Sequence, residues 1–201
     1  MRKIDLCFNL PLKECFKWKK IHHIDIIGTD NSNGYLTGTE ETYAINDSFV
    51  FRLKNKPKTL PFFKYLVVLS ESEMRITSKI PFFDILSMNN WNTYKIILKE
   101  LKKLNRKNIG IEIQMRYIRN CNSYEVGKWV KSIKEINKFC KLTGNQLIIS
   151  SGAETNYETI SANTFDSLLR IFDIDPMKYW NELDNWIETK SRVYYGASSE
   201  R

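Results

Sequence analysis

The chain has 201 residues, of which 42% are hydrophobic and 13% aromatic, so general disorder is excluded and one domain with a sizeable core is expected. The net charge of +8 favours an anionic partner, either nucleic acid, an acidic membrane surface or an acidic protein. No apolar run is long enough to cross a bilayer and the first residues lack a secretion signal, so we expect a soluble, cytoplasmic protein.

The first half of the chain is typical of short strands separated by helices and loops. Strands are predicted at 4–8, 24–27, 43–53 and 64–69, with a helix at 12–21 and a loop rich in Asn and Gly at 28–34. The pair Ser70 and Glu73 matches a capping box, which predicts a short helix after the last of these strands.

The second half alternates more regularly. Strands are predicted at 82–86, 109–113 and 147–149, and helices at 93–105, 124–142, 165–172 and 177–187. Asn122 with Glu125 predicts the start of the longest helix, and Gly144 predicts its end. We expect residues 1–190 to form a single domain and residues 191–201 to be a polar tail.

Strands that alternate with helices predict an α/β protein with a parallel sheet. A compact, closed TIM-like (β/α) barrel fits this pattern, and an open doubly wound sheet is the alternative. No strand is followed by Gly-x-Gly-x-x-Gly or a Walker-type loop, which disfavours dinucleotide and nucleotide triphosphate binding. Cysteines stand at 7, 15, 121 and 140 without a Cys-x-x-Cys pair, so reduced thiols and no zinc site are expected.

In a barrel, functional groups gather where strands end. The residues at these positions are hydroxyls and amides: Asn9, Thr29, Ser70, Ser87, Gln114, Ser150 and Ser151. The Ser-Ser pair lacks a Gly-x-Ser-x-Gly pattern, so we do not expect a serine nucleophile. Gly152 and Ala153, which follow the pair, are small, so another group can approach their backbone closely.

Four acids fall within predicted strands, and they suggest one catalytic hypothesis. If Asp5, Asp25, Asp84 and Glu112 all face the barrel interior, they can hold divalent metal for a phosphoesterase. The only histidines, His22 and His23, precede the second strand, which is the wrong end for such a site. We therefore favour the reading in which the acids form hydrogen bonds inside a non-catalytic barrel, with no metal bound.

Basic residues supply the candidate RNA contacts. Arg116 and Arg119 follow the strand at 109–113 and flank Tyr117, and guanidinium groups with a stacking ring suit RNA phosphates and unpaired bases. Lys107, from a basic cluster before the same strand, joins them as a candidate. A structural role for both arginines, such as an ion pair with Glu112 or with a helix, stays open at this point.

The motifs, taken in order, resemble a known family. Asp84-Ile85-Leu86-Ser87, Ile109-Gly110-Ile111-Glu112-Ile113, a long helix and Ile148-Ile149-Ser150-Ser151-Gly152-Ala153 look like archaeal ribonuclease P protein component 3. This family includes the thirty-kilodalton subunit of eukaryotic nuclear ribonuclease P. The opening Ile4-Asp5-Leu6 also resembles the family's first strand, and the similarity is clearest from 64 to 172.

The resemblance implies a single-domain TIM-like barrel, related to metal-dependent hydrolases but without their metal ligands. It implies that the chain alone is not catalytic and binds no cofactor, because the catalytic RNA, with Mg²⁺, removes the 5′ leader of precursor tRNA. The implied partners are that RNA and protein component 2, as a heterodimer or heterotetramer. Ser150 and Ser151 are then expected to bond the barrel rim or RNA. The family's Leu-Arg-Ser-Pro is replaced here by Thr159-Ile160-Ser161-Ala162, and residues 34–61 match poorly.

Overall fold

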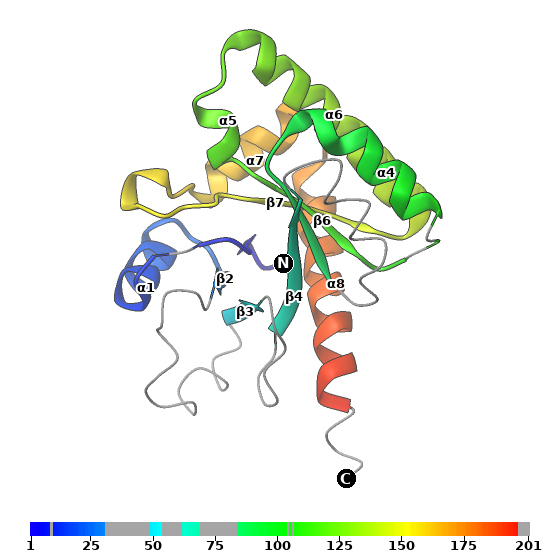
Figure 1. The fold of residues 1–201 in the computed structure, drawn as a ribbon. Coiled ribbons are helices and arrows are strands. Elements are labelled where there is room, and N and C mark those ends of the chain that lie inside the picture. Colours follow the sequence, from blue (N-terminus) through cyan, green and yellow to red (C-terminus); the bar gives the residue numbers. More distant parts are fainter. Residues whose placement is uncertain are drawn as a thin grey trace.

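The computed structural model is a mixed α/β protein whose strands all run parallel (Figure 1). It describes residues 1–8, 10–30, 49–53, 62–68, 84–103, 105 and 107–196. The short helix expected after Ser70, the residue Asn9 and the segment 31–48 lie outside the described residues.

In the part of the chain that the structure describes, seven strands pair in the order in which they occur in the sequence. They are β1 (Ile4–Asp5), β2 (Ile26–Asp30), β3 (Phe49–Leu53), β4 (Phe62–Val68), β5 (Ile85–Met88), β6 (Gly110–Gln114) and β7 (Gln146–Ser150). β5, β6 and β7 are buried at every position, as expected for parallel strands that are covered on both faces. The predicted loop at 28–34 was partly wrong, because Gly28 to Asp30 continue β2 beside β3.

The segments that follow β1 and β7 come together. Phe8 and Ala153 form an isolated parallel bridge, and the Ser151 hydroxyl donates a hydrogen bond to the carbonyl of Cys7 at 3.1 Å. Within β7, the N–H of Ile149 donates to the hydroxyl of Tyr179, which lies in the last described helix, at 2.7 Å. A fully closed barrel stays a prediction.

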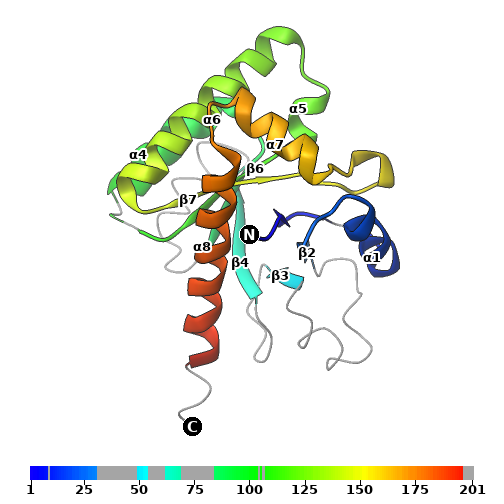
Figure 2. The ribbon, with the colours of Figure 1, turned by 180° about the vertical axis from the view of Figure 1, so that it is seen from behind.

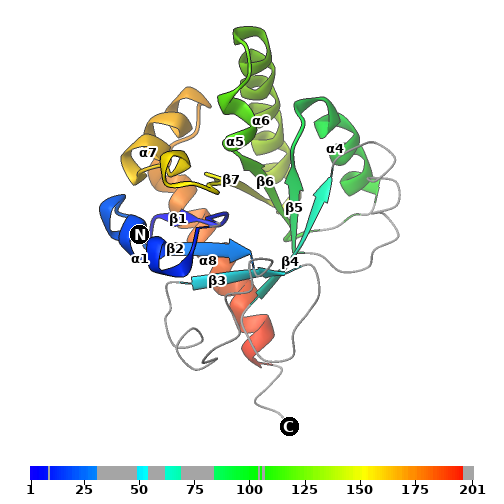
Figure 3. The same cartoon turned by 60° about the vertical axis from the view of Figure 1, so that its left-hand side comes forward.

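Helices lie around the outside of the strands (Figure 3). They are α1 (Leu12–Ile21), α4 (Tyr94–Lys103), α5 (Arg116–Arg119), α6 (Ser123–Thr143), α7 (Ala162–Ile171) and α8 (Pro176–Gly196), with 3-10 turns η2 (Trp91–Thr93) and η3 (Asn156–Glu158). Seen from behind, α8 crosses β7 (Figure 2). Among the described helices, none combines the length and apolar character needed to cross a bilayer.

Local sequence explains the ends of α6. Its Asn122 and Glu125 form the predicted capping box, and Gly144 adopts φ 71° at the C-cap. Helix α8 differs from prediction, because it continues past Ile187 to Gly196. Its Trp180 is fully buried, together with Trp129 of α6 and Phe165 of α7, so the long helices supply much of the core that covers the sheet.

Candidate functional site at the carboxyl end of the sheet

Two serines at the carboxyl end of β7, Ser150 in its last position and Ser151 just after it, point into the protein. The Ser150 hydroxyl donates to Glu112 Oε1 at 2.9 Å, and the Ser151 backbone N–H donates to Asp5 Oδ1 at 3.0 Å. All four side chains have no exposed surface. Both serine hydroxyls are therefore committed to interior hydrogen bonds, and the predicted contact of these serines with RNA stays a prediction.

Burial changes the acidity of Asp5. Loss of solvent raises the pKa of its carboxyl group to about 6, and the nearby charge of Glu112 adds to the increase. Hydrogen bonds from Ser151 and from the Cys7 N–H, which lies 3.2 Å from Oδ1, lower the pKa but do not cancel this effect. Oδ2 has no hydrogen-bond partner among the described residues.

Other buried polar atoms without a described hydrogen-bond partner lie at the same end of the sheet. Besides Asp5 Oδ2, they are Asn89 Oδ1 after β5, Gln114 Oε1 at the end of β6 and Arg116 Nε just beyond it. The Gln114 amide nitrogen is engaged, since it donates to Glu112 and to Ser87, both at 3.1 Å. Buried polar groups are normally paired, so this concentration marks the carboxyl end as the chemically distinctive end of the strands.

The structure does not bring the four acids together. Asp5 and Glu112 are interior, but Asp25 precedes β2, is exposed, and accepts the Lys3 backbone N–H at 2.6 Å. Asp84 precedes β5 and pairs with Lys190 of α8 at 3.0 Å. The condition that all four acids face the interior is not met, because Asp25 is exposed before β2. Asp84 is buried and bonded to a lysine, but it lies at the amino end of β5, away from Asp5 and Glu112. Within the described residues, no three His, Cys, Asp or Glu side chains gather as metal ligands would.

Arg116 and Arg119 connect α5 to the loop that follows β7. Arg116 pairs with Glu154, donates to the Tyr117 hydroxyl at 2.8 Å, and lies 4.8 Å from the centre of that ring. Gly152, at φ 65°, leaves room for the Arg116 side chain, because an added Cβ would lie 2.9 Å from it. Arg119 bonds the carbonyl of Glu158 and lies 3.6 Å from its carboxylate.

These contacts give the two arginines a structural role as ion-pair partners, which was one of the two alternatives in the sequence. The carboxylates that they pair with belong to Glu154 and Glu158 rather than to Glu112. Their side chains are still 27% and 30% exposed, so contact of these arginines with RNA stays a prediction. Lys107 is exposed but precedes β6, whereas Arg116 follows β6. The predicted basic set is therefore divided between the two ends of this strand.

Sequence reasoning missed how strongly the positive charge is localised. Residues 94–144 contain 13 Lys and Arg against four Asp and Glu, a net charge of +9, whereas the whole chain carries +8. Helices α4 and α6, which lie side by side in Figure 1, bear most of it. The exposed lysines on these helices are Lys95, Lys99, Lys102, Lys103, Lys131, Lys138 and Lys141. A charge count in successive windows would have revealed this basic band.

Aromatic rings accompany the basic groups at the carboxyl end. Trp91 follows β5, Tyr117 follows β6 and Tyr157 follows β7, so three neighbouring strands each lead to a ring. The Lys128 ammonium group lies 6.0 Å from the Trp91 ring and 4.8 Å from the Tyr124 ring. Tyr124 is 68% exposed and Tyr157 fully exposed. Cations beside accessible rings are a combination suited to single-stranded nucleic acid.

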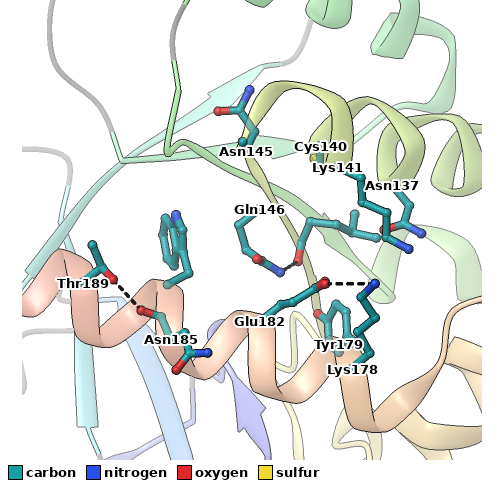
Figure 4. A pocket seen from close by; sticks show the side chains of 13 residues that line it. Asn137, Cys140, Lys141, Asn145, Gln146, Lys178, Tyr179, Glu182, Asn185 and Thr189 are labelled. Carbon is teal, nitrogen blue, oxygen red and sulfur yellow. Dashed lines mark hydrogen bonds and ion pairs between the residues drawn. The ribbon is translucent and has the colours of Figure 1, made fainter.

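A separate pocket of about 540 Å³ lies between α6, β7 and α8 (Figure 4). It is at the amino end of β7, where Gln146 begins the strand, and is remote in the fold from the rings that follow the strands. Several of its polar side chains already have partners: Lys178 lies 3.8 Å from Glu182, and the Thr189 hydroxyl donates to the backbone carbonyl of Asn185. We therefore regard the carboxyl end, with the adjoining basic band, as the candidate site.

Comparison with known proteins assigns no function to this site. The chain matches no protein-family model and no curated protein.

Proposed function

We propose that the chain binds RNA and, more specifically, that it is a non-catalytic protein subunit of the ribonuclease P ribonucleoprotein acting in the cytoplasm. The observation that carries the RNA part is the net charge of +9 over residues 94–144, on helices that adjoin exposed aromatic rings. Lys and Arg neutralise phosphates and release counterions, and rings stack on bases.

The proposal that the chain is a ribonuclease P subunit is supported by the ordered motifs at 84–87, 109–113 and 148–153. They overlap strands β5, β6 and β7 and include residues just before β5 and β6 and just after β7. Consecutive parallel pairing, with the Phe8–Ala153 bridge between the segments after β1 and β7, supports the proposal of a compact (β/α) barrel. In this proposal the RNA, with Mg²⁺, cleaves precursor tRNA, and the chain, with protein component 2, stabilises the folded RNA.

Reconstitution tests the finer assignment. Catalytic RNA and all other protein subunits are combined with precursor tRNA at low Mg²⁺, with or without this chain. We expect the chain to increase the rate of 5′ leader removal, because its cations replace part of the charge screening that Mg²⁺ provides. An unchanged rate across the Mg²⁺ range would rule out the ribonuclease P assignment but not RNA binding.

The basic band itself predicts a change in salt dependence. Replacing Lys131 and Lys138 of α6 with alanine should reduce RNA affinity and lower the slope of log K against log salt by about two, since each phosphate contact contributes about one. Titrations with a structured RNA at several salt concentrations measure this slope.

The matched control removes two exposed lysines from α1, Lys17 and Lys20. This variant has the same net charge as the α6 variant but retains the basic band. Its slope should stay close to that of the unmodified chain. Equal slopes for the two double variants would show that affinity follows total charge rather than the band.

A further inference from the structure

We infer that Trp91, Tyr124 and Lys128 form a stacking platform for an unpaired RNA nucleotide, an inference that rests on the proposed RNA-binding function. The platform would hold the base against an aromatic face and a phosphate near the ammonium group. It specifies which RNA feature the protein recognises, namely a single-stranded segment rather than a continuous duplex.

The three side chains are brought together from two elements of the structure. Trp91 belongs to η2, whereas Tyr124 and Lys128 are four residues apart on α6 and so share one helix face. The Lys128 ammonium group is near both rings, at 6.0 Å from Trp91 and 4.8 Å from Tyr124.

Both elements are fixed by capping hydrogen bonds. The Asn90 side chain accepts the N–H of Asn92 at 2.8 Å at the start of η2. The capping box of Asn122 and Glu125 orders the first turn of α6, which carries Tyr124. The platform is thus preorganised, which reduces the entropy cost of binding.

Packing does not account for the Tyr124 ring. It is 68% exposed, and the described residues provide no hydrogen bond to its hydroxyl. Tyr94 shows the contrasting case, since it is 7% exposed and its hydroxyl donates to Glu135 at 2.8 Å, which joins α4 to α6. An exposed ring beside a cation has π-face available for a ligand, and a nucleobase with its phosphate matches both groups.

The chemistry favours unpaired bases over duplex RNA. Bases within a duplex are already stacked on their neighbours, so their faces are not available to an aromatic side chain. Sequence-tolerant stacking on single strands contributes about 1–3 kcal/mol per base. Loss of one such contact therefore corresponds to a fall in affinity of roughly 5- to 150-fold.

The test compares a labelled, unstructured RNA of roughly ten nucleotides with a duplex of the same length, using fluorescence anisotropy with the full chain. We expect Tyr124→Leu to weaken binding of the single strand within that range and to leave duplex binding nearly unchanged. Tyr124→Phe, which keeps the ring, should retain the single-strand affinity. Met177→Ala, which removes an exposed apolar side chain of α8 outside the candidate site, is the control and should leave both affinities nearly unchanged.

The outcomes separate this inference from the function on which it rests. If the unmodified chain binds RNA with strong salt dependence but Tyr124→Leu affects both ligands equally or neither, the platform is overturned and RNA binding stands. If the unmodified chain binds neither RNA, both proposals fail. Unfolding temperatures of all variants verify that exposed-site substitutions leave the fold intact.

Discussion

Replacing Gly28 with alanine should lower the free energy of unfolding by about 3 kcal/mol, a large part of the stability of an ordinary domain. Gly28 lies in β2, and its carbonyl accepts the N–H of Phe8 at 2.8 Å. An added Cβ would overlap the Leu6 carbonyl oxygen and lie 2.7 Å from the Leu6 Cα. These are backbone atoms, so the segment after β1 would have to move, and its hydrogen bond to β2 would be strained.

Urea denaturation measures the change, with Gly127→Ala as the control. Gly127 is inside α6, and an added Cβ there meets nothing within 4 Å. Alanine should stabilise that helix by about 0.5–1 kcal/mol. A Gly28→Ala protein within about 1 kcal/mol of the unmodified chain would show that β1 and β2 do not approach as closely as described.

The unmodified chain should lose stability as the pH rises from about 4 to about 6, and Asp5→Asn should abolish this loss. The folded pKa of Asp5 is raised to about 6 from an ordinary 3.8, chiefly because its carboxyl group is fully buried. Between these values the folded state keeps a proton that the unfolded state has lost, so stability falls as pH rises and the cost is complete above pH 6. The full effect is about 3 kcal/mol.

Asparagine stays neutral, and its oxygen can still accept from the N–H groups of Ser151 and Cys7. The variant should therefore be at least as stable as the unmodified chain at pH 7.5, and the difference between their pH profiles should appear between pH 4 and 6. Asp25→Asn is the control, because Asp25 is exposed at the other end of the strands. If Asp5→Asn retained the full pH dependence, the carboxyl group would not carry the buried charge.

Local sequence was sufficient for the regular elements of the second half of the chain. Helix α6 was predictable because Asn122, Glu125 and Gly144 are themselves the capping groups, and their hydrogen bonds join residues close in sequence. Strand β7 was recognisable because Leu147 to Ile149 is a continuous apolar run, as is typical of buried parallel strands. Strand β6 was recognisable from the isoleucines at 109, 111 and 113, which alternate with Gly110 and Glu112. The four-residue helix α5 gave no such signal, since one turn has no periodicity to detect.

The sequence by itself also determined that positive charge is concentrated in residues 94–144, because charge depends on composition alone. Only the tertiary structure decided which acids are buried. Asp5 meets Ser151 across 146 residues of sequence, and Asp84 meets Lys190 across 106. Such pairings depend on which strands and helices become neighbours. Local patterns, which extend over a few residues, contain no information about these distant contacts, and so they located the candidate polar groups without indicating which of them face the interior.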